Sequence, residues 1–515
     1  MLPEPVARRM PRPFSHPLSP WVACLLAHVL AACSAASDSA LPGPRPPVLM
    51  ITIDTLRADH LGCYGYSPYA EPVSPAIDAF ARQGVRFEQC FVPRGQTAPS
   101  LCSLMVGKYP SMHGVRENGQ PFAGTQTTLS ERMSALGYRT SAFLSRLPAS
   151  PLGHPAQGTD ELVSGKKKRL VQQADSDAFV TSKAIEWLSS RSPDDERPFF
   201  CWVHLYDVHQ PYTPPPPFDR LFTGDYAGPL LGRQGQPDWR KIDTRLGHAA
   251  VTETPLDPAD HRYVIGLYDG GVRAADSLVG KLLETLDARG LAEETLVILT
   301  ADHGEELADH GAYYYHGNSI YDGTLRVPWI VRWPGRLPVD TTFEPLVQSL
   351  DLVPTLLTWL GEDVPDELEG VSLARSLASD DPAPPRQHVY SEWQDLIWTV
   401  RDAEHKYVLN PRGAHPKKPP FERFQRGFRL HCEELYGIDE DPTESVDRLL
   451  DRPLVRDSMR AQLLQFRGRP GGLTGWSVHE DAAVAENLAS LGYVGTDEER
   501  TDVLIGAESC ESERR

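Results

Sequence analysis

The segment VLMITID, from Val48 to Asp54, determines the fold class of this chain. It is an uninterrupted apolar run that ends at an acidic residue. Strands that are buried on both faces of a parallel sheet have this composition, whereas strands with one wet face alternate apolar and polar residues. Similar runs occur at 199–205, 296–300 and 327–331. We therefore predict a mostly parallel sheet that is covered on both faces.

Amphipathic segments lie between these runs. The spacing of apolar residues predicts helices at about 74–84, 177–190 and 261–290. Gly84 and Gly290 are placed where C-terminal helix caps are expected. Strands that alternate with helices along a chain indicate an α/β fold.

Three of the apolar runs lead into residues that can bind metals or transfer protons: Asp54, Asp207 with His209, and Asp302 with His303. In open α/β sheets, ligands bind beyond the carboxyl ends of the strands. Core packing does not require Asp and His at three such ends, so we predict a functional site there. Two structural alternatives stay open at this point, because an Asp can cap a helix and a His can be a hydrogen-bonded core residue.

A further candidate is Thr97, at the start of the segment TAPSLCSLMVGKYPSMHG that spans 97–114. Pro99 suits the first turn of a helix, which we predict to continue to about Val106. Thr97 then lies at the helix N-terminus, where free N–H groups and the helix dipole favour an anion. A hydroxyl in that position can attack a phosphoryl or sulfuryl centre if a metal or a base activates it.

The segment 97–114 resembles the sulfatase signature, in which Cys or Ser, any residue, Pro, Ser and Arg precede a Thr-Gly-Arg-Tyr-Pro-like stretch and His-Gly. Other segments are similar to further sulfatase motifs, in family order: 54–65, 206–212, 268–270, 302–307, 316–321, 351–355 and 435–442. The resemblance to the sulfatase family, within the alkaline phosphatase superfamily, covers about residues 47–450. It implies a mostly parallel, alkaline-phosphatase-like sheet between helices, with a smaller C-terminal α+β subdomain, and a hydrolase that acts on ester bonds.

The resemblance also implies a metal site. Asp54, Asp302 and His303 match the family's ligands for one divalent ion, and Thr97 completes the shell. Oxygen ligands with one imidazole are compatible with Zn²⁺, Mn²⁺ or Ca²⁺. Such an ion would stabilise the Thr97 alkoxide and polarise the ester.

Three further site residues come from the same comparison. His209 and His316 match positions that face the leaving group, where they act as general acids or, with Asp207, as ligands of a second metal. Asn118 matches a position where related phosphoesterases keep an Asn that faces the oxygens of the substrate. A structural role is the alternative for both histidines, and for Asp207 as a residue that orients a neighbour.

The chain departs from the sulfatase pattern at three positions. Formylglycine is made from Cys or Ser, so Thr97 cannot supply the usual sulfatase aldehyde. The signature arginine is replaced by Leu101, and Thr55 replaces the usual second Asp of the first metal segment, which counts against an all-oxygen calcium site. A threonine nucleophile is similar to that of phosphoethanolamine transferases and nucleotide pyrophosphatase/phosphodiesterases, which form a phospho-threonine.

Three functional hypotheses follow. The first is a hydrolase of phosphate mono- or diesters, or a phosphotransferase, that works through Thr97. The second is a sulfuric ester hydrolase that acts without formylglycine, which Thr97 and Leu101 count against. The third is a non-catalytic lipoprotein that binds glycans, which the intact Asp54, Asp302 and His303 count against. Because the sequence has no run of transmembrane helices, we prefer a hydrolase to a lipid-headgroup transferase. The substrate, a small-molecule, glycan or lipid ester, and the oligomeric state stay open.

The N-terminus predicts export. Three arginines precede an apolar stretch at 21–32 that is shorter than the ~20 residues needed to span a bilayer, so it is typical of a signal peptide. It ends in LAAC at 30–33, which resembles a bacterial lipobox and predicts a lipid on Cys33 that holds the protein on a membrane surface. The alternative is a plain secretory signal cut near Ala36. We expect the bacterial cell envelope, with Ser34 favouring the outer membrane, or a secreted or periplasmic protein.

Composition and charge complete the prediction. The formal net charge of −19 would repel phosphate backbones, so we expect no nucleic-acid partner. We divide the chain into a signal peptide (1–33), a linker (34–46), a sulfatase-like catalytic domain (47–385), a C-terminal subdomain (386–475) and a tail (476–515). Short strand-like runs at 389–393, 396–400 and 406–409 indicate a meander in the subdomain.

Overall fold

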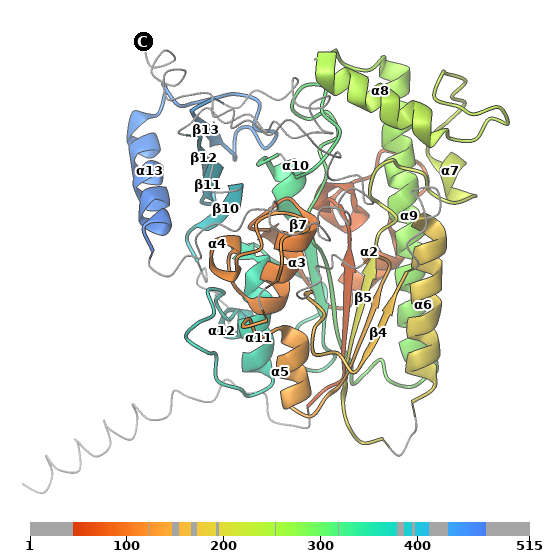
Figure 1. Cartoon of the computed structure of the whole chain (residues 1–515), viewed down its shortest axis with the longest axis vertical. Coiled ribbons are helices and arrows are strands. Elements are labelled where there is room, and N and C mark those ends of the chain that lie inside the picture. Colours follow the sequence, from red (N-terminus) through yellow and green to blue (C-terminus); the bar gives the residue numbers. More distant parts are fainter. Residues whose placement is uncertain are drawn as a thin grey trace, which may run out of the picture.

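A computed structural model of the chain describes residues 45–122, 124–146, 154–165, 173–191, 195–252, 254–317, 319–378, 386–393, 397–410 and 431–469 (Figure 1). Cys33 and the signal peptide, the linker up to residue 44 and the tail from 476 lie outside these residues. Within the described part, no helix combines the length and the apolar character that a membrane span requires.

The large sheet has the strand order β4-β3-β5-β1-β6-β7-β2-β8, and β9 pairs with β2. Its strands are β1 (Val48–Ile53), β2 (Val85–Phe91), β3 (Arg139–Leu144), β4 (Glu161–Ser164), β5 (Phe199–Leu205), β6 (Leu296–Ala301), β7 (Arg326–Arg332), β8 (Thr341–Phe343) and β9 (Val347–Gln348). Every residue of β1, β5 and β6 is buried, as the apolar runs predicted. The sheet is mostly parallel, but β7 is antiparallel to both of its neighbours, β6 and β2.

The register brings the predicted strand ends together. β1 lies between β5 and β6 and is parallel to both, with Ile53 opposite Leu205 on one side and Ala301 on the other. The residues that follow these three strands therefore meet at one edge of the sheet. β2 is antiparallel to β7, which is antiparallel to β6, so β2 runs in the direction of β1 and also ends at this edge.

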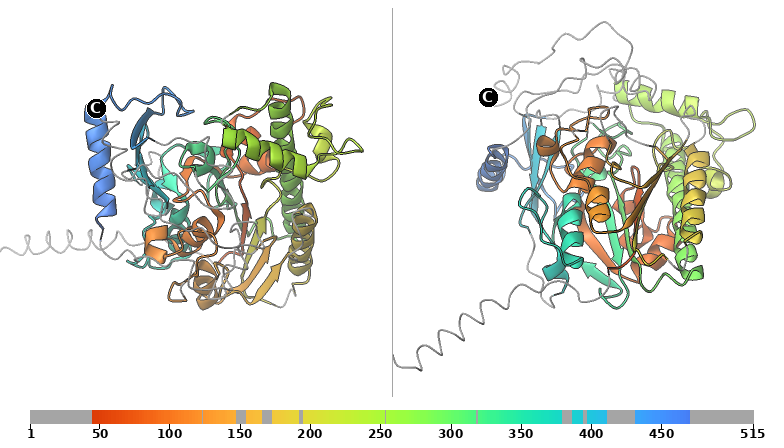
Figure 2. Two further views of the ribbon diagram at one scale, coloured as in Figure 1. Left: turned by 45° about the horizontal axis from the view of Figure 1, so that its top comes forward. Right: turned by 60° about the horizontal axis from the view of Figure 1, so that its bottom comes forward.

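Helices cover both faces of the sheet, as a parallel sheet requires. α6 (Gln173–Ser189) and α9 (Pro258–Ala288) lie side by side on one face, while α3 (Thr97–Val106), α5 (Leu129–Ala135) and α11 (Leu352–Trp359) lie on the other (Figures 1 and 2). The remaining helices are α2 (Pro75–Ala81), α4 (Pro110–His113), α7 (Phe218–Leu221), α8 (Trp239–Thr252), α10 (Asp322–Leu325), α12 (Ala374–Leu377) and the short η1 (Ala58–His60), η2 (Gly62–Tyr64) and η3 (Ser349–Asp351).

The two predicted glycine caps differ in outcome. Gly290 has φ +68° just after the end of α9, the left-handed conformation that favours glycine at a helix C-terminus. Gly84 is not a cap, because α2 ends at Ala81. A Cβ at Gly84 would lie 2.1 Å from the carbonyl oxygen of Val331, so glycine is needed there for a close approach to β7.

The C-terminal part is a separate antiparallel sheet of β10 (Val389–Trp393), β11 (Ile397–Arg401), β12 (His405–Leu409) and β13 (Glu433–Gly437), covered by α13 (Pro453–Arg467). The predicted meander is confirmed for its first three strands. This sheet contacts the segment that follows β2, since Glu392 N–H donates to the carbonyl of Pro93 at 2.9 Å and Ser391 Oγ donates to that of Val92 at 2.8 Å. The predicted domain boundaries, 47–385 and 386–475, stay a prediction.

Candidate active site

Three predicted metal ligands meet at the carboxyl ends of β1 and β6. One ligand atom from each of Asp54, Asp302 and His303 lies within 4.8 Å of the others, and all three side chains are buried. Asp54 is fixed in place because its N–H donates to the carbonyl of Leu205 at 2.9 Å, which extends the pairing of β1 with β5 by one residue.

The carboxylates of this triad have oxygens without partners. Both Asp54 oxygens and Oδ2 of Asp302 lack a hydrogen-bond partner, although both side chains have no exposed surface. Oδ1 of Asp302 accepts from the N–H groups of Thr55 and His303 at 3.2 and 2.8 Å. Burial and the nearby Asp302 raise the pKa of Asp54 well above its usual value. Because an unpaired buried carboxylate is costly, this arrangement fits a bound divalent cation.

His303 is held in the form that a metal ligand needs. Its Nδ1 faces the carbonyl of Gly304 at 2.8 Å, so this nitrogen carries the proton and Nε2 carries a lone pair. Nε2 lies 3.4 Å from Oδ2 of Asp302 and 3.7 Å from Oδ1 of Asp54. Burial lowers the pKa of His303 to about 4, which keeps the ring neutral at pH 7.

Thr97 is the first residue of α3, as predicted, and its hydroxyl donates to Nε2 of His303 at 3.3 Å. Two contacts fix this helix end. Ser100 Oγ donates to the carbonyl of Asp302, and Oδ1 of Asn118 accepts from the N–H of Ala98 at 2.7 Å. With Oδ1 so engaged, the amide NH₂ of Asn118 is the end that can donate to a substrate oxygen.

His209 and His316, predicted to face the leaving group, lie together at this edge. Their ring centroids are 4.7 Å apart, and His316 is 4.5 Å from His303. Nδ1 of His209 donates to the carbonyl of Gln210 at 2.6 Å, so its Nε2, which has no partner, is the nitrogen left for chemistry. Burial and the neighbouring His316 lower the pKa of His209 well below its usual value.

Glu305 is a site residue that the sequence analysis did not assign. Its Oε1 lies 2.9 Å from Nδ1 of His316, and the carboxyl group is fully buried. Burial raises the pKa of Glu305 well above its usual value. A carboxylate on one ring nitrogen fixes the orientation of an imidazole, so Glu305 aims Nε2 of His316. Its position two residues after His303 was the available signal, but proximity in sequence does not reveal the partner.

Asp207 is turned toward a different group. Its N–H donates to Oδ2 of Asp177 at 2.7 Å, and its side chain also hydrogen-bonds Asp177. Burial raises the pKa of Asp177 to about 6. Among the described residues, Asp54, Asp302 and His303 are the one acid–histidine group close enough to share an ion. The second metal at Asp207, His209 and His316 stays a prediction.

Two more residues reach the triad from neighbouring strands. His204 on β5 pairs with Thr52, its Nδ1 lies 2.9 Å from that hydroxyl, and its Nε2 lies 3.9 Å from Oδ2 of Asp54. Arg146, two residues after β3, packs over the ring of Tyr206 at 4.8 Å, and its charge lowers the pKa of Asp54. No motif marks either residue, because each is brought near Asp54 by the pairing of β5 with β1 and β3 and not by its local sequence.

Thr55, which replaces the usual second Asp, has a φ of +56°, a conformation that a β-branched residue rarely adopts. The hydroxyl of Tyr268 donates to its carbonyl at 2.8 Å and accepts from the N–H of Arg57 at 3.0 Å. These two bonds hold the turn that presents Asp54, and such strain is typical of functional sites.

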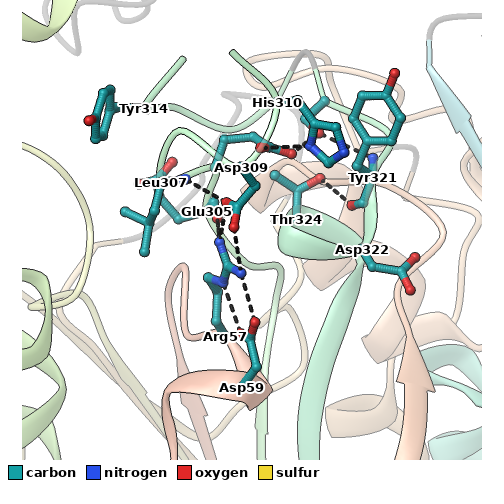
Figure 3. A network of polar contacts seen from close by, with 12 residues as sticks. Arg57, Asp59, Glu305, Leu307, Asp309, His310, Tyr314, Tyr321, Asp322 and Thr324 are labelled. Atoms are coloured by element: carbon teal, nitrogen blue, oxygen red, sulfur yellow. Dashed lines mark hydrogen bonds and ion pairs between the residues drawn. The ribbon is translucent and has the colours of Figure 1, made fainter. Parts of the chain in front are cut away.

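The loops after β1 and β6 are joined by a buried arginine (Figure 3). Arg57 donates to Asp59 at 2.9 Å, to Asp309 at 2.5 Å and to the carbonyl of Glu305 at 3.0 Å. His310 lies 3.2 Å from Glu306, which raises the pKa of His310 to about 9 despite burial. Asp59, Asp309 and His310 therefore have structural roles that hold these loops together.

Known proteins resemble this chain over most of its length. The family described as Sulfatase matches residues 46–362, and the family described as N-sulphoglucosamine sulphohydrolase, C-terminal, matches residues 309–467. The N-acetylglucosamine-6-O-sulfatase of Bacteroides thetaiotaomicron is 24% identical over 78% of this chain and 82% of its own length. The multifunctional alkaline phosphatase superfamily protein PehA of Trinickia caryophylli is 26% identical over 68% of this chain and 80% of its own length.

Solved structures share the fold. The phosphonate monoester hydrolase of Agrobacterium radiobacter aligns with a TM-score of 0.64 at 20% identity, over 82% of this chain and 95% of that one. A protein solved in complex with its substrate D-glucosamine-2-N,6-O-disulfate aligns with the same TM-score at 19% identity, over 82% and 98% of the two chains. The predicted α/β architecture with a smaller C-terminal sheet is therefore confirmed.

Proposed function

This chain belongs to the sulfatase family of ester hydrolases, and from the geometry of its site we propose that it hydrolyses phosphoric esters with Thr97 as the nucleophile. One observation carries the proposal. The Thr97 hydroxyl lies at the N-terminus of α3 and contacts His303, whose Nε2 also faces the unpartnered oxygens of Asp54 and Asp302. An anion at this helix end meets both a nucleophile and a ligand set for a cation.

Asp54, Asp302 and His303 would hold a divalent cation, with the Thr97 oxygen beside them. When bound, the ion supplies positive charge that favours the alkoxide of Thr97 and draws electron density from the ester. The donor set of carboxylates and one imidazole is compatible with Zn²⁺ or Mn²⁺. A leucine at 101 and a threonine at 55 leave fewer charged ligands around the substrate than the sulfatase pattern provides.

In the first step, the Thr97 oxygen, having lost its proton to solvent, attacks phosphorus. The bond from phosphorus to the alcohol oxygen breaks, and that oxygen leaves with the electron pair and takes a proton from Nε2 of His316. Burial lowers the pKa of His316 to about 4, so the ring gains this proton only when the substrate anion is bound, and the contact of Glu305 with Nδ1 favours the protonated form. In the second step, water attacks the phospho-threonine, gives a proton to His316 and returns Thr97 to its alkoxide form.

Residues of the chain favour phosphate over sulfate chemistry. Threonine cannot be converted to the aldehyde that sulfatases use, and Leu101, at the position of the signature arginine, is fully buried inside α3. Relatives of both kinds exist, since PehA is named as an alkaline phosphatase superfamily protein and others are named as sulfatases. Sulfate ester hydrolysis is the second candidate, because the family match and most of the named relatives favour it.

The test compares matched esters. Purified protein is loaded with Zn²⁺ or Mn²⁺ and assayed with 4-nitrophenyl phosphate, bis(4-nitrophenyl) phosphate and 4-nitrophenyl sulfate. We expect phosphoester turnover that falls by at least about 10³-fold in Thr97→Ala, the range seen when a nucleophile is removed. Thr181→Ala is the matched control, since this threonine on α6 is also buried and its hydroxyl has no hydrogen-bond partner. Sulfate turnover that survives Thr97→Ala would contradict the assignment.

We also propose that the mature protein is attached to the cell envelope through a lipid on Cys33. The lipobox-like sequence that ends at Cys33 supports this. Mass spectrometry of the full chain made in a bacterial host checks it. We expect an acylated N-terminal peptide that begins at Cys33 and that is lost in Cys33→Ala, whereas an unmodified N-terminus near Ala36 would show a plain secretory signal.

A further inference from the structure

Arg94 is a buried cation that the proposed reaction does not use. It lies between β2 and α3, and because β2 runs in the direction of β1, this segment is at the edge of the sheet that carries the active site. Only 1% of Arg94 is exposed. Its Nε and Nη1 have no partner, and its Nη2 donates to Oε1 of Gln96 at 3.3 Å.

A buried guanidinium without an acidic partner is unfavourable unless a ligand supplies one. No ion pair or hydrogen bond joins Arg94 to a carboxylate in the described part of the chain. Burial lowers the pKa of Arg94 to about 9, while the charges of Glu117 and Glu392 act in the opposite direction. The group therefore remains positive at neutral pH and offers N–H donors on two nitrogens that nothing occupies.

Gln96 and His316 relate Arg94 to the reaction. Gln96 directly precedes Thr97 at the N-terminus of α3, and its side chain lies against Gly317, where a Cβ would be 3.7 Å from Nε2 of Gln96. Burial lowers the pKa of His316, which precedes Gly317, and the nearby positive charge of Arg94 also lowers it. Arg94 is thus on the side of the histidine that serves the leaving group, and the half-buried Gln96 side chain contacts both Arg94 and the residue that follows this histidine.

We propose that Arg94 determines substrate specificity by binding a second oxyanion, carried by the alcohol part of the ester. The inference rests on the proposed function, because it takes the side of His316 as the leaving-group side. The substrate anion displaces the amide oxygen of Gln96 and accepts charge-assisted hydrogen bonds from Arg94. The substrate class is then an ester of an alcohol that itself carries a carboxylate or a similar anion.

The test measures binding without turnover. Metal-loaded Thr97→Ala is titrated calorimetrically with 4-nitrophenyl phosphate and with 3-carboxy-4-nitrophenyl phosphate, which differ by one carboxylate. We expect the carboxylated ester to bind about 10-fold more tightly, the range for a hydrogen bond to a charged group. Adding Arg94→Met should bring the ratio of the two dissociation constants to about 1, and Arg94→Lys should leave an intermediate ratio.

Arg332→Met is the matched control. Arg332 is also a buried arginine with a lowered pKa, but it ends β7, whose antiparallel direction places it at the opposite edge of the sheet. The preference should persist in this variant. Equal binding of the two esters to Thr97→Ala, or an unchanged preference after Arg94→Met and Arg94→Lys, would overturn the inference. If the wild type hydrolyses no phosphoester, the proposed function fails, whereas the binding ratio still decides the role of Arg94.

Discussion

Replacement of Asp54 by Asn should separate stability from function at the metal site. Ligand atoms of Asp54 and Asp302 lie within 4.8 Å of each other, and three of their four oxygens have no partner. At an effective dielectric constant of about 20, two unit charges 4.8 Å apart repel by about 3.5 kcal/mol. The pKa of Asp54 is raised by burial and by this repulsion from Asp302. We therefore expect Asp54→Asn to stabilise the metal-free protein by about 1–3 kcal/mol.

The sign of the effect depends on pH and on metal. Because burial and Asp302 raise the pKa of Asp54, its contribution to metal-free stability is fully present below the unfolded value of 3.8 and is lost as pH rises through the raised pKa. The gain from Asp54→Asn should thus be largest at neutral pH and absent near pH 3. With metal at about 100 times its Kd, the wild type gains about 2.7 kcal/mol. The variant should lose that gain together with activity.

Urea unfolding in chelator and in metal measures both effects. The control is Asp269→Asn, since this buried carboxylate accepts from the hydroxyls of Tyr66 and Tyr69 at 2.8 and 2.7 Å. That change removes satisfied hydrogen bonds and should destabilise the protein by about 1 kcal/mol. If Asp54→Asn in chelator is less stable than the wild type at pH 7, the carboxylates are not the strained metal site described above.

Two further outcomes are expected from the fold. Gly84→Ala should lower the free energy of unfolding by about 2–3 kcal/mol in urea titrations, because the new Cβ would lie 2.1 Å from the carbonyl oxygen of Val331. Gly280→Ala, inside α9, should raise the free energy of unfolding by about 0.5–1 kcal/mol, because the nearest atom to its new Cβ is 3.4 Å away. If Gly84→Ala changes the free energy of unfolding less than Gly280→Ala does, β7 must be able to move away from the new Cβ at little cost. The contact with Glu306 raises the pKa of His310 to about 9. The ion pair therefore stabilises the folded protein fully below pH 6.5, and this stabilisation is lost as the pH rises through 9. His310→Gln should therefore remove up to about 3 kcal/mol of the pH dependence of unfolding in that window, and an unchanged slope would contradict the pairing.

The architecture of the site was largely predictable because each strand end carries its own signal. A continuous apolar run followed by Asp54, or by Asp302 with His303, marks both a buried parallel strand and a candidate ligand at its carboxyl end. Pro99 near the start of α3 placed Thr97 correctly in the same way. These features depend on local sequence, and the register of neighbouring strands then brings them together.

The features of the fold and of the site that were not predicted depend on contacts between distant segments, which local sequence patterns do not encode. The reversed direction of β7 and the close approach of Gly84 to it both come from sheet pairing. Likewise, His204 is aligned with the triad through its neighbour on β1, and Arg94 lies beside the site only because β2 ends at the same edge. Asp207 is a further example, since its N–H group donates to Asp177, a contact that the motif does not reveal.

The most direct test of the central claim is to trap the intermediate. Metal-loaded protein is mixed with 4-nitrophenyl phosphate, quenched in acid within milliseconds and digested, and the peptide that contains Thr97 is analysed by mass spectrometry. We predict a phosphate on Thr97 that appears with the first turnover, decays as substrate is exhausted and is absent in Thr97→Ala. Turnover of the phosphoester with no modified Thr97 peptide at any quench time would contradict the account and would show that water attacks the ester directly.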